Sequence, residues 1–331
     1  MKKIDTRNNI LIVSIGIILT TLALVSCEKR DDDVLGSKQE YSKTVVFTDA
    51  ADEQTRAYYN NTSTTMPTAE YVLSSEDSSD NLFMYEYVTD FSDESIMTRA
   101  SQYETSDLNN FDVLCYTGSG AKVGDLCNMV IKNGTEWHYD PEINWSKVGS
   151  ASVAFYAYAN VPTSAAISQP NNGNPTLTYT TIPQLSSNQV DIVVAKTPAQ
   201  YNSATTSKVP LSFNHICAGV QFVLDDLTQD GKTQGTFASI KLVDIASDGA
   251  VYDMVTGKWD ITNSNVKKKT FELAKNGNSV NFDDVFMLVP QTLGGSAKIE
   301  IEFKSATSGV ESYIQKFSYD LANIKWEAGK I

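Results

Sequence analysis

The chain has only two histidines, which limits the acid–base and metal chemistry that it could perform. His138 lies between Trp137 and Tyr139, and His215 ends an apolar run. Neither histidine has cysteine or carboxylate neighbours at the spacing of zinc ligands. We interpret both as packing or capping residues of strands. We therefore predict no catalytic residue, no metal site and no cofactor, and we do not expect an enzyme.

Two other segments resemble ligand-binding sequences in composition: one is rich in glycine, as phosphate-binding loops are, and one is rich in aspartate, as cation sites are. The glycine-rich stretch Gly118–Gly124 lacks the Gly-Lys-Ser/Thr step of a phosphate loop and is not followed by a helical pattern, so it predicts a hairpin loop. Asp31, Asp32 and Asp33 lie in a charged segment without apolar periodicity, where no preformed cage for a cation is expected. We interpret this segment as a solvated tether.

Cys27 follows a predicted signal peptide directly and is our candidate for lipid modification. Basic residues up to Arg7 precede the apolar run Ile10–Val25, as in a secretion signal. The ending Val25-Ser26-Cys27 resembles the lipobox of bacterial lipoproteins, which implies cleavage before Cys27 and its acylation by the lipoprotein-processing machinery. Acyl chains such as palmitate contribute about 0.8 kcal/mol per buried methylene to membrane binding. The alternatives are a retained membrane helix and an unmodified Cys27.

Three further cysteines leave an odd number in an exported chain. These are Cys115, Cys127 and Cys217. Cys115 and Cys127 could pair across a hairpin, but their apolar surroundings also suit plain buried cysteines. The sequence leaves both possibilities open.

Composition favours an all-β fold and argues against nucleic acid as a partner. The formal net charge is −14, which would repel nucleic acid. The 331 residues include 16 Tyr and 13 Phe, with many Thr, Ser, Asn and Val, which favours an all-β protein. Short apolar runs separated by turn residues predict strands. The predicted strands cover 44–47, 82–88, 111–116, 126–131, 152–159, 177–180, 190–195, 209–213, 219–224, 237–245, 258–261, 270–273, 285–289, 298–303 and 313–319.

These strands and the polar segments between them suggest the domain organisation. We predict a signal peptide over 1–27, a flexible acidic tether over 28–43, an N-terminal β-sandwich over 44–215 and a C-terminal β-sandwich over 216–331. The polar stretch 48–79 is expected to contain no strand.

Aromatic side chains gather between Trp137 and Tyr158. If exposed, they could stack on sugar rings. However, Val153 and Phe155 alternate with Tyr156 and Tyr158, which favours a strand with both faces packed. We therefore expect core residues rather than a glycan platform.

Eight short motifs follow one another along the chain. They are Trp137-His138-Tyr139-Asp140-Pro141, Val153–Pro162, Asp191–Ala195, Val209–His215, Gly219–Phe222, Gly257-Lys258-Trp259, Met287–Gln291 and Trp326–Lys330. Each motif is weak alone, but in their order and spacing they resemble the fimbrillin-like (Mfa-like) lipoproteins of Bacteroidetes.

This resemblance implies two tandem transthyretin-like β-sandwich domains in a subunit of surface pili. It also implies that an arginine-specific surface protease removes the first strand, so that the open groove accepts a strand from another pilin subunit. The strand 44–47 precedes Arg56-Ala57, our leading cleavage position, and Arg99-Ala100 is the alternative. Both arginines could instead be ordinary exposed loop residues.

The leading functional hypothesis is a lipid-anchored outer-membrane protein on the cell surface or in a fimbrium, acting as a pilus subunit, tip or anchor and supporting cell adhesion. The alternative is a non-polymerising lipoprotein that binds a glycan or host protein. The family usually continues with another strand after Gly329-Lys330, whereas this sequence ends at Ile331; either it is truncated or a groove is left open.

Overall fold

The computed structural model describes residues 10–14, 47–49, 68–75, 81–88, 108–123, 128–133, 136–139, 145, 152–197, 209–224, 235–305 and 314–331. Within these ranges strands make up nearly all of the regular structure, and one short 3-10 helix, η3, covers Ser186–Asn188. The predicted all-β fold is confirmed. The number of domains and their boundaries remain predictions.

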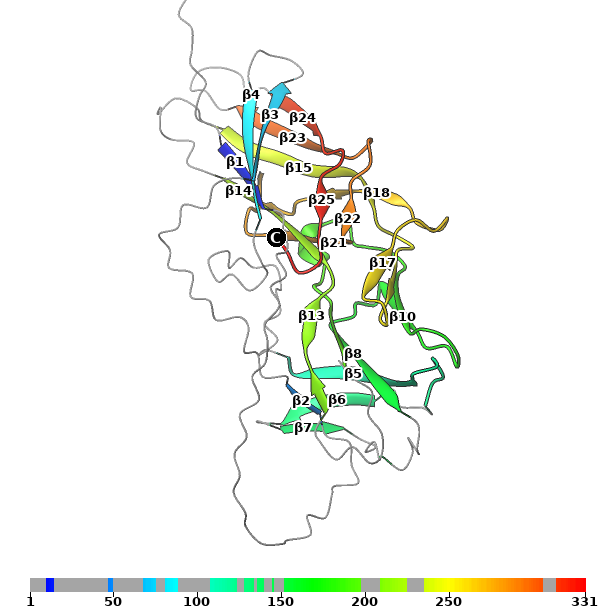
Figure 1. The fold of residues 1–331 in the computed structure, drawn as a ribbon. Coiled ribbons are helices and arrows are strands. Elements are labelled where there is room, and N and C mark those ends of the chain that lie inside the picture. The colour runs from blue at the N-terminus through cyan, green and yellow to red at the C-terminus, as the bar shows by residue number, and fades with distance from the viewer. Residues whose placement is uncertain are drawn as a thin grey trace, which may run out of the picture.

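The largest element is a nine-stranded sheet at one end of the molecule (Figure 1). All of its pairs are antiparallel except the pair formed by β1 and β4. In spatial order its strands are β18 (Lys268–Glu272), β15 (Gly235–Ala246), β23 (Lys298–Ser305), β24 (Ile314–Asp320), β3 (Ala69–Ser75), β4 (Asn81–Tyr87), β1 (Ile10–Ser14), β14 (Ala218–Leu224) and β21 (Val285–Leu288).

A six-stranded antiparallel sheet lies at the other end. Its β5 and β6 form a hairpin, and the loop after β5 contains Gly118 and Gly120, which confirms the hairpin-loop interpretation of this glycine-rich stretch. In spatial order the strands are β13 (Phe213–His215), β11 (Val193–Lys196), β8 (Val153–Ala159), β5 (Asn110–Thr117), β6 (Asn128–Asn133) and β7 (Glu136–Tyr139).

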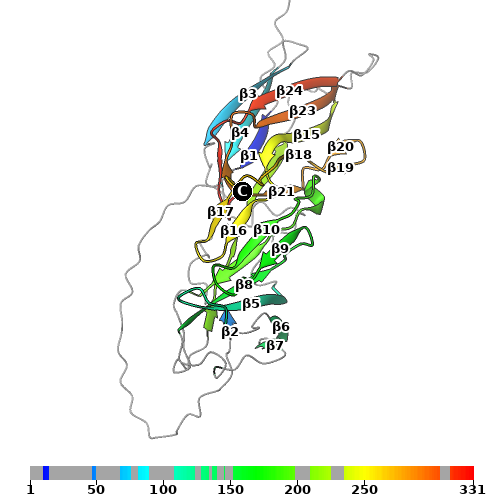
Figure 2. The same ribbon diagram turned by 90° about the vertical axis from the view of Figure 1, so that its right-hand side faces the viewer.

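A four-stranded sheet lies between the two larger ones, as both ribbon views show (Figures 1 and 2). Its strands are β17 (Lys258–Asp260), β16 (Val251–Asp253), β10 (Thr176–Tyr179) and β9 (Ala165–Ser168). Three two-stranded pairs complete the structure. They join β2 (Phe47–Asp49) to β12 (Val209–Leu211), β19 (Lys275–Asn276) to β20 (Ser279–Val280), and β22 (Gln291–Thr292) to β25 (Lys325–Trp326).

The alternation of side chains along β8 explains why the six-stranded sheet is covered on both faces. Val153 and Phe155 point into a smaller hydrophobic core, whereas Tyr156 and Tyr158 belong to a larger core shared with the other sheets. Every residue of β8 is buried. The expectation that the aromatic cluster packs on two faces is therefore confirmed.

Most of the predicted strands are present, but two differences stand out. The expected strand 44–47 corresponds to β2, which begins at Phe47. β3 lies inside 48–79, so the expectation that this stretch contains no strand was wrong. Although β3 is flanked by polar residues, its Tyr71 and Leu73 lie on the covered face, and pairing with β4 and β24 fixes it in the sheet.

Candidate functional site

The place of β1 in the nine-stranded sheet is the most informative feature for function. β1 lies between two strands: Ile10–Ser14 pairs in parallel with Phe83–Tyr87 of β4, and Leu11–Val13 pairs antiparallel with Phe222–Leu224 of β14. Its residues belong to the apolar run that the sequence assigns to a secretion signal. A segment expected to be removed thus occupies an internal position in a sheet. We call this position the β1 slot.

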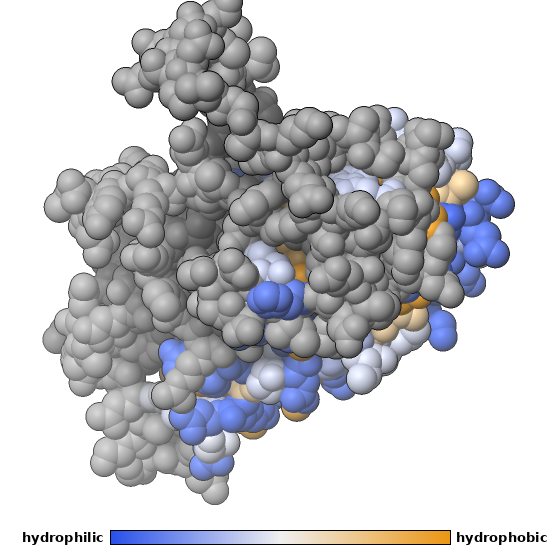
Figure 3. Space-filling view, turned by 90° about the horizontal axis from the view of Figure 1, so that it is seen from below, coloured by the Kyte–Doolittle hydropathy of each residue, from blue (hydrophilic) through white to orange (hydrophobic). Residues whose placement is uncertain are grey.

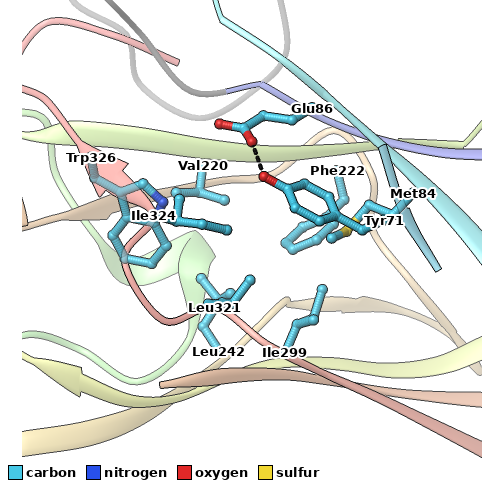
Figure 4. Close-up of a pocket in the computed structure, with 10 residues that line it drawn as sticks. All are labelled: Tyr71, Met84, Glu86, Val220, Phe222, Leu242, Ile299, Leu321, Ile324 and Trp326. Atoms are coloured by element: carbon cyan, nitrogen blue, oxygen red, sulfur yellow. Dashed lines mark hydrogen bonds between the residues drawn. The ribbon is translucent and has the colours of Figure 1, made fainter. Parts of the chain in front are cut away.

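A small cavity lies in the core beneath the β1 slot (Figure 4). Both neighbours of β1 contribute to it, with Met84 and Glu86 from β4 and Val220 and Phe222 from β14. Its volume is about 10 Å³, which is enough for no more than one water molecule. The cavity is therefore a packing gap and not a small-molecule site. The other residues around it are Tyr71, Leu242, Ile299, Leu321, Ile324 and Trp326.

One polar pair borders this apolar cavity. The Tyr71 hydroxyl donates a hydrogen bond to Oε2 of Glu86, as Figure 4 shows. Burial raises the pKa of the Glu86 carboxyl, and the hydrogen bond from Tyr71 lowers it by less. Burial and the neighbouring Glu86 raise the pKa of Tyr71. The pair therefore places a carboxyl group with a raised pKa alongside the β1 slot, because Glu86 is in register with Val13 of β1.

The second N-terminal strand, β2, makes a different contact. Its three residues pair in parallel with β12, from Phe47↔Val209 to Asp49↔Leu211. Val209 and Leu211 are buried in the smaller core. β2 precedes Arg56 in the chain, so a cut after Arg56 would release both β1 and β2.

The modification and processing positions predicted from sequence lie outside the described residues. These positions are Cys27, Arg56, Ala57, Arg99 and Ala100.

The cysteines within the described part of the chain are buried thiols. Cys115 is free and buried, which agrees with the non-disulfide alternative, and Cys127 lies outside the described residues. Burial raises the pKa of Cys115 to about 12 and that of Cys217 to about 12. At neutral pH both are protonated, so neither is suited to act as a nucleophile.

A buried polar cluster lies where β13 leads into β14. The Asp191 carboxylate is fully buried, and its Oδ2 lies 2.6 Å from Nδ1 of His215. Nearby, the Tyr179 hydroxyl lies 3.7 Å from the Cys217 thiol, and the Tyr179 ring stacks on Trp259. His215 is thus a packing residue held by a carboxylate, as expected from its position at a strand end. The sequence pattern did not identify Asp191 as the partner of His215, although Asp191 directly precedes a buried apolar run.

Other chemistry is limited in the described part of the chain. His138 is exposed, and in the described ranges no group of three or more His, Cys, Asp or Glu residues could hold a metal ion. Among these residues no helix is long and apolar enough to cross a membrane.

The aromatic residues proposed as a glycan platform are mostly unavailable. Trp145, Phe155, Tyr156 and Tyr158 are buried, and Trp137 packs against Phe111 with ring centroids 4.9 Å apart. Viewed from below, the described surface is largely hydrophilic, with hydrophobic residues in small separate patches (Figure 3).

One family model matches most of the amino-acid sequence. The family model described as "Fimbrillin-like" matches residues 98–331. No curated protein matches the chain.

Solved structures give weaker matches. A fimbrial protein from Bacteroides vulgatus is 14% identical with a TM-score of 0.45, and the match covers 66% of this chain and 84% of that protein. A candidate cell adhesion protein from Bacteroides uniformis is 16% identical with a TM-score of 0.40, covering 69% and 86%. The fimbrial anchor protein Mfa2 from Porphyromonas gingivalis is 12% identical with a TM-score of 0.33, covering 59% and 69%.

Proposed function

The chain belongs to the fimbrillin-like family, and on this premise we propose that it is a pilus subunit, tip or anchor that joins other subunits by strand exchange and supports adhesion. We also propose that it is a lipoprotein attached to the outer membrane through Cys27 and displayed on the cell surface or in a fimbrium. The observation that carries the proposal is the β1 slot, because a segment of the predicted signal peptide fills it.

Loss of residues 1–27 would remove β1 and separate β4 from β14. The main-chain N–H and C=O groups that these two strands direct at β1 would then lack partners, and unpaired strand edges readily accept another strand. A strand from a second subunit could pair with both edges, as in other cases of strand addition. The internal position matters here, since an incoming strand would gain hydrogen bonds on two sides.

Proteolysis after an arginine would enlarge the opening. A cut after Arg56 would also remove β2 and expose the edge of β12. A cut after Arg99 would in addition remove β3 and β4, so that β24 and β14 would border a wider gap. The family match begins at residue 98, so the matched part would survive either cut almost whole. We keep Arg56 as the leading position and Arg99 as the alternative.

Arg56→Ala combined with Arg99→Ala tests the processing step. In the wild-type protein from its native cell surface, we expect an N-terminus at Ala57 or Ala100 and a ladder of SDS-resistant bands in unboiled samples. The double variant should keep an acylated Cys27 and form a much weaker ladder, because without the arginine cut only the β1 slot is open. Arg30→Ala is the matched control, since this arginine lies in the predicted tether, and it should leave the ladder unchanged.

A ladder of normal intensity in the double variant would remove the processing claim. If the wild-type protein were always a monomer with an acylated Cys27, the proposal that it polymerises through a vacated groove would be wrong. The chain would then act as an anchor or as a stand-alone binding protein.

A further inference from the structure

A second, more open cavity lies between the six-stranded and four-stranded sheets, far along the chain from the β1 slot. Its volume is about 430 Å³, within the range of about 300–1,000 Å³ found for ligand pockets. It is bordered by the β5–β6 loop, the start of β8, the end of β11, the β9–β10 loop and the turn after β16. Its lining includes Ser119, Tyr156, Asn174, Lys196 and Val255.

Two loops that form one wall of this pocket hold each other in place. Gly173 N–H donates to the Gly120 carbonyl at 2.9 Å, Lys122 N–H donates to the Asn171 carbonyl at 3.0 Å, and Ala121 forms an isolated β-bridge. Gly120 and Gly173 have φ values of +83° and +116°, which side chains other than glycine rarely adopt. The wall is therefore built before any ligand arrives, which lowers the entropic cost of binding.

The pocket contains hydrogen-bonding groups that remain available. The Tyr156 hydroxyl donates to no other residue that the structure describes, although its ring is buried. Burial and the charge of Asp253 raise the pKa of Tyr156, so the hydroxyl stays protonated and can donate. Lys196 donates one ammonium proton to the Val255 carbonyl and retains two more.

Acceptors are present beside these donors. Nδ2 of Asn174 donates to Oδ2 of Asp253 at 2.6 Å, which fixes the amide and leaves its oxygen as an acceptor. The Ser119 hydroxyl lies 2.9 Å from the Thr117 hydroxyl and can donate or accept. Hydroxyl, amide and ammonium groups thus surround one space.

The charges near the pocket argue against a strongly anionic or cationic ligand. Lys196 supplies one positive charge. Burial alone would raise the pKa of Asp253, but hydrogen bonds from Asn174, Thr256 and Val255 lower it overall, so this carboxylate is ionised. Among the described residues at the pocket one cation and one anion balance, so a phosphate or polyanion would find too little positive charge there. A ligand rich in hydroxyl groups with apolar C–H faces fits better.

We propose that this pocket binds a neutral saccharide of one or two rings. The hydroxyl of Tyr156 and the ammonium of Lys196 donate to sugar oxygens, and the amide oxygen of Asn174 accepts from a sugar hydroxyl. Val255, Pro175 and Ala154 supply apolar contact for the sugar ring. This site is independent of strand exchange, so it can be present in a monomer and in an assembled subunit.

Saturation-transfer NMR on the purified full chain tests the proposal, with glucose, galactose, mannose, N-acetylglucosamine and their common disaccharides as probes. At least one probe should bind with an affinity of about 1 mM, as expected for a small polar ligand. Tyr156→Phe and Lys196→Met should each weaken this binding at least about tenfold. The controls Tyr85→Phe and Lys258→Met remove the same groups from β4 and from exposed β17 and should bind as wild type does.

Absence of binding by every neutral probe would overturn the proposal, and so would preferential binding of glucuronic acid. Unchanged binding in Lys196→Met would also overturn it. Lys196 is exposed, so this variant remains informative if Tyr156→Phe does not fold. Pilus assembly is scored separately from sugar binding, so the failure of one proposal is distinguishable from failure of the other.

Discussion

The six-stranded and nine-stranded sheets are completed in different ways. All six strands of the smaller sheet come from residues 110–215. In the larger sheet, β3, β4 and β1 from the first 87 residues lie between β24 and β14 from the C-terminal half. Figure 1 shows them as blue and cyan strands among yellow-green to red ones. The smaller sheet is thus complete without the N-terminal segments, whereas the larger sheet depends on them.

This difference explains how one chain can combine a stable body with an exchangeable strand. Pairing between segments so distant in sequence carries a higher loop-closure cost than local pairing. Loss of β1 can therefore open the β1 slot while the six-stranded sheet keeps its own hydrophobic core. We expect β1 to lie in the region that is easiest to replace.

The largest effects should come from truncating one buried phenylalanine in each region. Phe155→Ala and Phe222→Ala each remove a fully buried ring and should cost about 3–5 kcal/mol of unfolding free energy. In a chain that starts at residue 28, the cost of Phe155→Ala should persist. The cost of Phe222→Ala should be smaller there, because Phe222 pairs in register with Val13 of β1, which that chain lacks.

Hydrogen exchange resolved by segment, combined with urea unfolding, measures these costs in β8 and β14. Phe155→Ala serves as the internal control for Phe222→Ala. Equal losses for Phe222→Ala in the long and short chains would contradict the dependence of this region on β1.

The junction between the two sheets should give an intermediate effect. Asp191→Ala removes the buried partner of His215 at the end of β13, next to the start of β14, and should cost about 1–3 kcal/mol. Asp191→Asn keeps the size and one acceptor and should cost less. We expect the alanine variant to uncouple the two regions, so that calorimetry resolves two transitions.

Glu300→Ala is the matched control for the junction. Its carboxylate is partly exposed, lies 2.5 Å from the Lys298 ammonium and should contribute less than about 1 kcal/mol. A single transition at the wild-type temperature in Asp191→Ala would show that the pair does not couple the sheets.

Several strands could be predicted because their side chains alternate or form short apolar runs. β4, β5, β8, β14 and β23 follow this pattern, and so does the two-sided packing of Phe155 and Tyr156. The strand β3 was missed because its longest apolar run is only Tyr71-Val72-Leu73, between the polar residues Glu70 and Ser74. Its place is set by tertiary pairing with β4 and β24, which a local pattern does not contain.

The two sites were harder to predict for different reasons. The run Ile10-Leu11-Ile12-Val13 has both the apolar length of a signal segment and the β-branched residues of a strand, so its sequence alone does not reveal the pairing with β4 and β14. The polar pocket brings Ser119, Tyr156 and Asn174 together from three separate loops and strands. Such a grouping depends on how sheets pack, which no local motif encodes.

The smallest effect should come from Glu86, whose carboxyl lies alongside the β1 slot. Because burial raises its pKa in the folded state, the protonated form is favoured by folding. The stability that this group contributes is present below its unfolded pKa and is lost as the pH rises through the raised folded pKa. Glu86→Gln is neutral at every pH and can still accept the hydrogen bond from Tyr71. It should therefore stabilise the full chain at pH 7 by less than about 1 kcal/mol, since solvent screens a half-exposed group.

Urea unfolding at pH 4 and pH 8 measures this effect, with Glu70→Gln as the control that removes one exposed carboxylate from neighbouring β3. Glu86→Gln should increase the free energy of unfolding only at pH 8. In a chain that starts at residue 28 it should vanish, because loss of β1 lets water reach the residue that pairs with Val13. An equal gain in the short chain would mean that β1 does not bury Glu86, and that the larger sheet depends less on its N-terminal strand than its pairing indicates.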